Sequence, residues 1–586
     1  MLEFIAINMA PIMFAGLVVF LLLGYPVAFS LAANGLVFFA IGVWLAPYSA
    51  GNITLDWSLI GTMPQRVWGT MSNDTLLAIP FFTFMGIILE RSGMAEDLLD
   101  TVGQLFGPIR GGLAYAVIIV GALLAATTGV VAASVIAMGL ISLPIMLRYG
   151  YDRRVASGVI AASGTLAQII PPSLVLIVLA DQLGRSVGDM YAGAIIPGLV
   201  LTGLYMGYIF LVSVLRPNWV PALPLEARTL GHGVTSLLIA ILVCIGIGYA
   251  ARVWLYPTQG ANADILGATI GVVVIYLFAM FDKTLGLNSL SRLAQQFIIV
   301  LIPPLALVFL VLGTIFLGIA TPTEGGAMGA LGAMVLAAAK GRFTFAVVSQ
   351  ALASTTRLSA FVMFILIGAR MFSLTFYGVN GHVWVEHLLV GLPGGQTGFL
   401  IIVSLLVFLL AFFLDFFELA FIIVPLLVAP AEALGIDLIW FGVILAVNMQ
   451  TSFMHPPFGF ALFYLRSVAP RGPYNDKLTG ERLAGVSTGQ IYWGAVPFVI
   501  IQVVMIGVTI AFPQMVMHYK AAAIDPSTIE IKVPTLTPLA PDGRTAPGIG
   551  GTTLGAPKLG EPNLGAPKPG APKLDAPDLG APVVNP

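Results

Sequence analysis

Three ionisable side chains lie inside long apolar runs of the sequence. Asp415 and Glu418 are three residues apart within the apolar segment 399–430, and Arg370 lies within the apolar run 358–378. If these runs cross a membrane, an unpaired charge there costs at least ~2.5 kcal/mol, so a cation, a proton or an opposite charge must neutralise each group. Two hypotheses remain open. Arg370 forms a structural ion pair with these carboxylates, or Arg370 and Glu418 bind an anionic substrate, for which the planar guanidinium is well shaped.

Two Pro-Pro pairs interrupt further apolar runs. They are Pro171-Pro172, in the run 155–180, and Pro456-Pro457, in the run 438–465. A proline lacks the backbone N–H and disfavours helical geometry at the residue before it. Each pair therefore predicts a helix that opens at the prolines and leaves backbone carbonyls free to bind a cation.

Small oxygen-bearing residues accompany both Pro-Pro pairs. A Na⁺ site needs several hard oxygen ligands and little bulk, which hydroxyls, side-chain amides and freed carbonyls provide. We therefore predict Na⁺ or substrate contacts here; hydrogen bonds between helices are the alternative role of small polar residues in membranes. The candidates are Ser163, Gly164, Thr165 and Ser173 around the first pair and Asn448, Gln450, Thr451 and Ser452 before the second.

Two further polar motifs have both a structural and a functional interpretation. His455 directly precedes Pro456, where an imidazole either titrates near neutral pH or packs as a hydrogen-bonded core residue. Thr321-Pro322-Thr323-Glu324, followed by two glycines, combines the signals of a helix start. Glu324 is expected in the first turn, where the helix dipole stabilises a carboxylate, so this position is either structural or part of a gate.

Composition decides the environment of these residues. Of 586 residues, 58% are hydrophobic and only 9% are charged, whereas soluble domains carry roughly 25% charged residues. The sequence therefore predicts an all-α polytopic membrane protein, and its net charge of -1 excludes a basic field for nucleic acid. Cys244 is the single cysteine, so no disulfide framework is expected. Residues 1–8 contain no basic residue, which predicts that the first apolar run stays as a span.

Two apolar runs are too long for one crossing. A spanning helix needs ~20 apolar residues, but the runs at about 113–147 and 399–430 are longer and are broken near their middles by Thr128-Gly129 and by Asp415. Each run predicts a re-entrant helical hairpin. Backbone that leaves the helix at membrane depth must be buried or line a watery cavity, so Thr128 and Gly129 are candidate substrate residues.

The two halves of the chain share one order of motifs. A hairpin break is followed by Gly150-Tyr151-Asp152 or Gly435-Ile436-Asp437, and then by a Pro-Pro pair. Linker 148–154 holds three arginines, whereas its counterpart 431–437 holds two acidic residues and no basic one. Because cytoplasmic loops carry the excess of Lys and Arg, equivalent loops lie on opposite sides of the membrane. Inverted repeats with broken helices predict a secondary transporter whose site lies near the bilayer midplane.

This repeat gives the expected organisation of the chain. The first inverted repeat covers 1–215, an insertion with two additional transmembrane helices covers 216–295, and the second repeat covers 296–518. Residues 519–586 are rich in Pro and Gly, which predicts a disordered tail. The charge pattern places both termini on the periplasmic side, where the tail is either a docking arm or a dispensable extension.

Four motifs together resemble a known family. They are Gly318-Ile-Ala-Thr-Pro-Thr-Glu324, Ile169-Ile-Pro-Pro-Ser173, Phe413-Leu-Asp415 and Pro456-Pro457-Phe-Gly459. Over about residues 10–513 the chain resembles the large permease subunit of tripartite ATP-independent periplasmic (TRAP) transporters, in the longer branch of that family.

The resemblance implies a fold, a mechanism and partners. The fold is of the ion-transporter type, with a scaffold and an elevator transport domain, and the activity is Na⁺-driven uptake of a small carboxylate or 2-oxo acid. The implied partners are a small four-helix membrane subunit and a periplasmic substrate-binding protein. The implied Na⁺ regions are Thr128-Gly129, Ser163-Gly164-Thr165, Asp415 and Asn448 to Pro457. The chain departs from the family pattern at the first hairpin tip, which lacks a hydroxyl and a carboxylate, and at His455, where the family commonly has Thr.

The expected function is therefore that of an importer in the bacterial inner membrane, with Na⁺ as the coupling ion, no cofactor and no enzyme activity. A stand-alone H⁺-coupled organic anion exchanger or exporter of related fold is the alternative, which His455 and the missing tip carboxylate favour. An intramembrane enzyme is disfavoured because the sequence has no His-Glu-x-x-His motif and no serine-nucleophile constellation.

Overall fold

The chain folds almost entirely into helices. The computed structural model describes residues 2–128, 131–231, 233–259, 262–412, 414–476 and 479–520, with backbone alone at positions 22, 127, 128, 259 and 262. The described part contains one antiparallel strand pair, β1 (Tyr474–Asn475) with β2 (Arg482–Leu483). Nine described helices are long and apolar enough to cross a membrane, or up to 11 spans if each bent helix pair is one span. The predicted helical, polytopic fold is confirmed.

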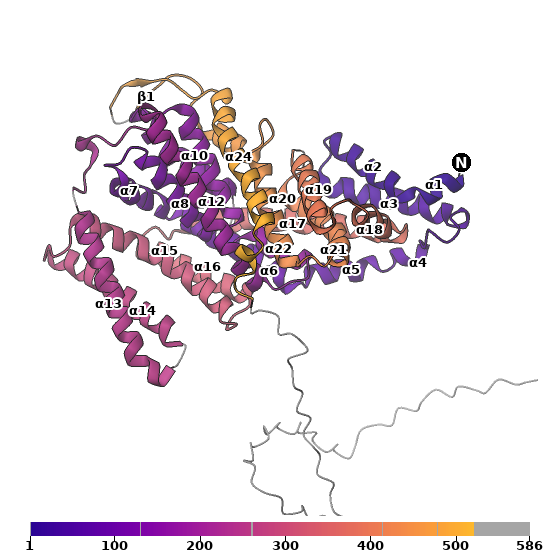
Figure 1. The fold of residues 1–586 in the computed structure, drawn as a ribbon, viewed down its shortest axis with the longest axis horizontal. Coiled ribbons are helices and arrows are strands. Elements are labelled where there is room, and N and C mark those ends of the chain that lie inside the picture. The colour runs from indigo at the N-terminus through magenta and orange to yellow at the C-terminus, as the bar shows by residue number, and fades with distance from the viewer. Residues whose placement is uncertain are drawn as a thin grey trace, which may run out of the picture. The chain divides into compact units, whose positions relative to one another are not determined.

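The first half of the chain forms α1 to α12 (Figure 1). The segments before the first hairpin are α1 (Leu2–Ile7), α2 (Met9–Leu22), α3 (Val27–Leu45), η1 (Ala46–Tyr48), α4 (Trp57–Ile60), α5 (Met63–Met71), α6 (Asp74–Arg91) and α7 (Met94–Phe106). Hairpin 1 consists of α8 (Gly112–Thr128) and α9 (Val131–Arg148). It is followed by α10 (Arg153–Thr165), the 3₁₀ helix η2 (Leu166–Gln168), α11 (Leu174–Gln182), α12 (Val187–Leu215), η3 (Pro217–Trp219) and η4 (Leu225–Ala227).

The second half begins after a helix pair that lies in the predicted insertion. That pair is α13 (Val234–Gln259) and α14 (Asn262–Leu285), and it leads to α15 (Arg292–Phe316), α16 (Pro322–Ala339), α17 (Phe345–Gly378) and α18 (Gly381–Val390). Hairpin 2 consists of α19 (Gly395–Leu410), α20 (Phe416–Glu418), the π-helix η5 (Leu419–Ile423) and α21 (Val424–Ala433). It is followed by α22 (Leu438–Gln450), the 3₁₀ helix η6 (Thr451–Phe453), α23 (Phe460–Val468), α24 (Thr488–Ala511) and α25 (Gln514–Met517).

The two repeats fold into matching segments. Helices α10 and α22 each have 13 residues, and Asp152 and Asp437 cap them by accepting hydrogen bonds from the N–H groups two and three positions further along. Gly150 and Gly435, both with positive φ, turn the chain before these caps. Each helix then leads through a three-residue 3₁₀ helix to a cis Pro-Pro bond and a nine-residue helix. The predicted duplication is therefore present in the backbone.

Close backbone contact joins the long helix α17 to α3. Gly35 lies against the α17 backbone at Phe372, and Gly368 lies against the backbone of Ala28. The hydroxyl of Thr375 donates to the Gly35 carbonyl over 2.8 Å. Small residues permit this approach, which stabilises helix pairs where lipid provides no hydrophobic driving force between them.

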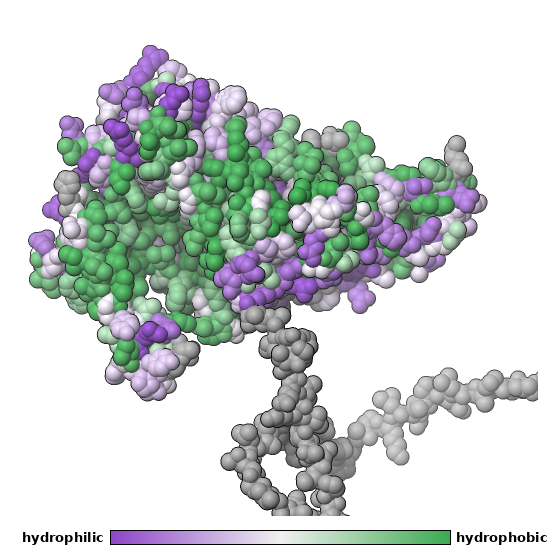
Figure 2. All heavy atoms as spheres, viewed as in Figure 1, coloured by the Kyte–Doolittle hydropathy of each residue, from purple (hydrophilic) through white to green (hydrophobic). Residues whose placement is uncertain are grey.

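Apolar side chains cover much of the surface as well as the core. Figure 2 shows hydrophobic residues over most of the face in view and hydrophilic residues beside β1 and along α4 and α5. In α13 and α14 of the insertion, only 17% and 22% of the residues in an apolar 18-residue stretch are buried. Surfaces of this kind face lipid rather than water.

Candidate functional site

Both Pro-Pro pairs lie where the helix is open, as predicted. In the first repeat η2 ends at Gln168 and α11 begins at Leu174, and in the second η6 ends at Phe453 and α23 begins at Phe460. Ser173 is fully buried in the first opening, where its hydroxyl donates to the carbonyl of Gln168 over 2.6 Å. The first opening is thus enclosed by protein, as backbone outside a helix requires at membrane depth, whereas Pro457 and Phe458 of the second opening are exposed.

Thr165 and Gln450 occupy equivalent positions in the two repeats and touch each other. The side-chain amide Nε2 of Gln450 donates to Oγ1 of Thr165 over 3.1 Å, and the two residues are 285 positions apart, the same separation as that of the two capping aspartates. Residues that contact their own equivalents lie beside the two-fold axis that relates two copies. Both side chains are fully buried, so this bond joins α10 to α22 where the repeats meet.

Several buried oxygens in these segments lack a partner. Among the described residues no donor reaches Oε1 of Gln450, Oδ1 of Asn448 or Oε1 of Gln168. Asn448 uses its amide nitrogen, which donates to the Ser404 carbonyl over 2.7 Å, and keeps its oxygen free. Buried polar atoms nearly always have a partner, so these oxygens suit a bound cation.

The other predicted ion ligands are buried and already donate hydrogen bonds. Ser163, Thr451 and Ser452 each donate to a carbonyl three positions earlier, over 3.0, 2.6 and 2.6 Å. A donating hydroxyl keeps its lone pairs and can still bind a cation. Gly164 has a packing role, because a Cβ there would lie 2.3 Å from the Val135 side chain in α9.

Asp415 and Glu418 cap the start of α20 with each other. Oδ1 of Asp415 accepts from the N–H of Glu418, and Oε2 of Glu418 accepts from the N–H of Asp415, both over 2.9 Å. This reciprocal capping box explains their spacing of three residues. Neither carboxylate has a basic side chain within 4.0 Å in the part of the chain that the structure describes, and Arg370 donates to Thr70 instead. The hypothesis of a structural ion pair with Arg370 is therefore wrong.

His455 is buried between two phenylalanine rings. Its ring centroid lies 4.3 Å from that of Phe408 and 4.2 Å from that of Phe412. Of the described residues, none forms a hydrogen bond with either ring nitrogen. The phenylalanines explain why the imidazole is buried, but they leave both nitrogens open to a ligand.

The Thr321-Pro322-Thr323-Glu324 motif starts α16, as predicted. Thr321 and Glu324 form a second capping box, with distances of 3.2 and 2.8 Å. The hydroxyl of Thr323 donates to the carbonyl of Asp74. The motif therefore begins one helix and ties it to the start of α6.

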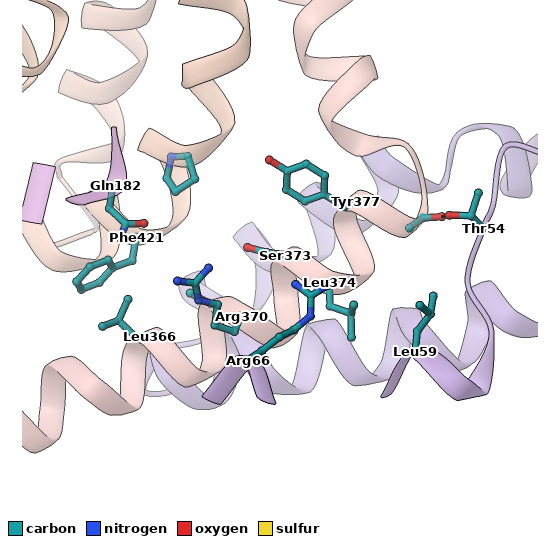
Figure 3. Close-up of a pocket in the computed structure, with 13 residues that line it drawn as sticks. Thr54, Leu59, Arg66, Gln182, Leu366, Arg370, Ser373, Leu374, Tyr377 and Phe421 are labelled. Carbon is teal, nitrogen blue, oxygen red and sulfur yellow. Dashed lines mark hydrogen bonds between the residues drawn. The ribbon is translucent and has the colours of Figure 1, made fainter. Parts of the chain in front are cut away.

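A cavity of about 520 Å³ lies beside Arg370. Its lining joins α5 and α17 on one side to Gln182 of α11 and Phe421 of hairpin 2 on the other. Figure 3 shows the side chains of Arg370, Arg66 and Tyr377 around this space. Its described lining contains no acidic residue, so Glu418, the predicted neighbour of Arg370, is not among the residues that line it.

Arg66 also lines this cavity and was not among the residues predicted from the sequence. It lies in a short polar stretch between apolar runs, which is typical of a connecting loop, and only its place on α5 (Met63–Met71) brings it beside Arg370. Thr128 and Gly129, predicted at the tip of hairpin 1, lie outside the described residues: the side chain of Thr128 and the whole of Gly129 are not described.

The family of the chain follows from a direct comparison. Residues 14–515 match the DctM component of the tripartite ATP-independent periplasmic transporter. The chain belongs to this family. The TRAP family predicted from four motifs is thus confirmed over nearly the whole membrane part.

Three curated relatives illustrate the similarity. The large permease protein DctM of a C4-dicarboxylate TRAP transporter from Pseudomonas aeruginosa is 28% identical over 414 residues, which cover 70% of this chain and 81% of that protein. The isethionate TRAP transporter permease protein DctMQ of Oleidesulfovibrio alaskensis is 24% identical, with 79% and 61% covered. The ectoine/5-hydroxyectoine TRAP transporter large permease protein UehC of Ruegeria pomeroyi is 24% identical, with 83% and 97% covered.

Membership in the family gives the TRAP permease its general role. It is the large membrane subunit of a bacterial tripartite ATP-independent periplasmic transporter. The family implies a small membrane subunit and a periplasmic substrate-binding protein as partners.

Proposed function

We propose that this TRAP permease couples the uptake of a small organic anion, a carboxylate or 2-oxo acid, to Na⁺. The observation that carries the proposal is the set of buried oxygens on the two equivalent segments 163–168 and 448–452. Thr165 and Gln450 touch there, and the oxygens of Asn448, Gln450 and Gln168 have no partner within the described chain. Amide, carbonyl and hydroxyl oxygens are the ligands that hard cations prefer.

The charge of hairpin 2 also supports a cation. Asp415 and Glu418 lie beside each other, Glu418 is only 9% exposed, and the described residues offer no basic side chain within 4.0 Å. Two carboxylates in a low-dielectric site repel each other and lose hydration, which a bound cation offsets. The proposed Na⁺ ligands are those expected from the sequence, to which we add the unpartnered oxygens of Gln450 and Gln168. The expected ligands are Ser163, the backbone of Gly164, Thr165, Asp415, Asn448, Thr451 and Ser452.

The transported anion is proposed to meet Arg370 and then the residues of the hairpins and openings. Arg370 lines the cavity with no carboxylate among the described residues beside it, and two of the relatives are named for anions, C4-dicarboxylate and isethionate. The further proposed contacts are Thr128, Gly129, Ser173 and Glu418. Ser173 and Glu418 do not line the cavity of Arg370, so the anion must move from one place to the other.

An elevator movement accounts for this transfer. The cavity has one wall on α5 and α17 and another on α11 and hairpin 2. If the two hairpins and the opened helices move as one body past α3 and α17, the second wall carries the anion away from the first. This arrangement follows the general scheme in which one part of an inverted repeat moves around a midplane site.

Uptake into proteoliposomes tests the proposal. The permease is reconstituted with its small membrane subunit, and substrate is supplied on the cognate binding protein. Accumulation is expected to require both an inward Na⁺ gradient and that protein. Accumulation that persists when the Na⁺ gradient or the binding protein is left out would contradict the proposed mechanism.

A stand-alone H⁺-coupled exchanger is the second candidate. The observation that favours it is the buried imidazole of His455, whose two nitrogens have no hydrogen-bond partner in the described part of the molecule. A transport rate that is unchanged when Na⁺ is removed, but is lost when a protonophore is added, would support the exchanger and exclude the first proposal.

A further inference from the structure

Arg66 and Arg370 are oriented alike by threonines of one helix. Nε of Arg66 donates to the hydroxyl of Thr62 at the start of α5, and Nε of Arg370 donates to that of Thr70 near its end, each over 3.2 Å. Thr70 is itself only 1% exposed. Both bonds use Nε and leave the terminal NH₂ groups of the guanidinium for another partner.

No carboxylate within the described residues balances this pair. The described salt bridges use other basic residues, namely Arg148, Arg185, Arg252, Lys340 and Lys520. Neither Arg66 nor Arg370 has an Asp or Glu oxygen within 4.0 Å among the residues described. Two guanidinium groups on one cavity raise its positive potential, and an anion between them would lower it.

Further hydrogen-bond donors extend along the same face of α17. Arg370, Ser373 and Tyr377 recur at the spacing that places side chains on one face of a helix, and all three line the cavity. The volume of about 520 Å³ lies within the roughly 300–1,000 Å³ typical of small-molecule pockets. The cavity can therefore hold a small organic anion with donors around its charged end.

The position of the cavity indicates which side the anion comes from. Helix α17 begins just after Lys340 and Arg342, and Arg370 lies in its second half, toward the other end. Because cytoplasmic loops carry the excess of Lys and Arg, the start of α17 is expected on the cytoplasmic side. The opposite wall contains Gln182, the last residue of α11, and so lies at the far end of the broken helix that begins at the arginine-rich linker 148–154. Next to it, Asp181 accepts a hydrogen bond from Asn73 over 2.7 Å, which ties this end of α11 to the start of α6. The cavity therefore lies toward the predicted periplasmic side.

We infer that Arg66 and Arg370 form an outer anion site, which holds the carboxylate or sulfonate of the incoming substrate between α5, α17 and hairpin 2 before it reaches the hairpin tips. This inference rests on the proposed uptake of an organic anion and adds Arg66 as the second guanidinium of the site. A carboxylate side chain of the periplasmic binding protein has the same chemistry, so the experiment separates the two sources.

Reaction of a single cysteine reports on the site directly. Cys244 is the one native cysteine, so Ser373→Cys in a Cys244→Ala background places one thiol in the cavity of the complex with the small subunit. Its reaction rate is measured with two methanethiosulfonate reagents, one bearing a sulfonate and one bearing a trimethylammonium group. The sulfonate reagent is expected to be favoured on the order of tenfold, because a positive cleft concentrates anions.

Variants of Arg66 separate charge from geometry. Arg66→Gln is expected to remove most of the preference for the sulfonate reagent. Arg66→Lys is expected to keep this preference, because the charge remains, but to lose the bidentate hydrogen bonds that a guanidinium forms with an anion. Arg185→Gln is the matched control, because Arg185 pairs with Glu432 outside this cavity and should leave the preference unchanged. An unchanged preference in Arg66→Gln would overturn the outer site.

Protection of the cysteine identifies the occupant. Succinate and isethionate are each added without binding protein, at rising concentrations until the reaction rate of the cysteine stops changing. Each is expected to slow the methanethiosulfonate reaction in the protein that keeps Arg66, and to slow it much less in Arg66→Lys. Protection by the substrate-free binding protein alone, with no effect of either free anion, would overturn the substrate site in favour of a docking contact. The reagent preference needs no Na⁺, so uptake that proves independent of Na⁺ would contradict the proposed coupling and leave this result standing.

Discussion

Two of the three capping boxes in the described residues contain a glutamate and differ from each other by a single charge. Thr321 caps α16 with a hydroxyl, and Asp415 caps α20 with a carboxylate, while Glu324 and Glu418 complete the two motifs. Because a hydroxyl is sufficient for such a cap, the second carboxylate at the buried box is not needed to start the helix. Its position at the break of hairpin 2 therefore favours a role in binding a cation.

Replacing Asp415 by Asn separates capping from charge. Asn is as good a cap as Asp, so Asp415→Asn should keep the fold and the yield of complex. Loss of one charged ligand is worth about 1.5–3 kcal/mol, which predicts a rise of roughly 10- to 100-fold in the Na⁺ concentration that half-saturates uptake. Glu324→Gln at the exposed box is the control and should leave the Na⁺ dependence unchanged. An unaltered Na⁺ dependence in Asp415→Asn would restrict Asp415 to capping.

Arg370 gives a second prediction at this scale. Arg370→Ala removes a guanidinium that binds only a threonine hydroxyl within the described residues, so assembly with the small subunit should persist. Loss of a charge-assisted contact predicts a rise of at least ~10-fold in the half-saturating concentration of loaded binding protein, or loss of uptake. Size-exclusion chromatography and uptake measure the two effects. A variant that fails to assemble would show that Arg370 is structural.

At the scale of elements, one loop ties hairpin 1 to the end of the second repeat. Arg148, the last residue of α9, donates two hydrogen bonds of 2.8 Å to the carboxylate of Asp476, which also accepts from the backbone and hydroxyl of Thr479. Arg466 donates to the carbonyls of Val486 and Ala469 at the base of the same loop. These bonds fix the loop against the end of α9 on the predicted cytoplasmic side.

The Arg148–Asp476 pair makes the stability of this loop depend on pH, and the stability falls as the pH is lowered. The hydrogen bond from Arg148 lowers the pKa of Asp476 below its usual range. The pair therefore stabilises the loop fully above the ordinary aspartate pKa of ~3.9, and this contribution is lost as the pH falls toward the lowered value. Proteolysis of the loop should be slow and constant between pH 5 and 8 in the native protein and faster throughout that range in Asp476→Asn. Asp97→Asn, at the more exposed pair with Lys340, should change little. Native cleavage that rises already at pH 6 would contradict the assignment.

At the scale of the whole molecule, one contact joins the two repeats, whereas the cavity separates two groups of helices. The buried contact of Thr165 with Gln450 joins the two repeats, whereas the cavity of Arg66 and Arg370 is shared between α5 with α17 and the second hairpin. The proposed elevator movement requires that the first contact stays intact while the boundary at the cavity changes. The assignment of the cavity to the outer side depends on the orientation of the chain in the membrane.

The orientation can be checked with cysteines. In a Cys244→Ala background, Gly550→Cys in the tail is expected to react with an impermeant thiol reagent in intact spheroplasts, because the charge pattern places the C-terminus outside. Lys283→Cys, in a predicted cytoplasmic segment, should react only after permeabilisation. The reverse labelling would invert the topology and move the cavity to the cytoplasmic side.

The sequence by itself determined the features that depend on neighbouring residues. The membrane environment, the two hairpins, the openings at both Pro-Pro pairs and the cap at Thr321 all follow from composition or from signals within one or two helical turns. The order of those signals was enough to predict the duplicated backbone. Each of these features is local, so the residues that carry it are adjacent in the chain.

Only the tertiary structure decided which distant side chains meet. It brought Arg66 beside Arg370, separated Arg370 from Asp415 and Glu418, and buried His455 between two phenylalanines. Such pairings depend on how helices from far parts of the sequence pack, and many helix arrangements satisfy the same apolar pattern. Hydropathy therefore determined that this chain lies in a membrane, whereas helix packing determined which of its few charges share a cavity.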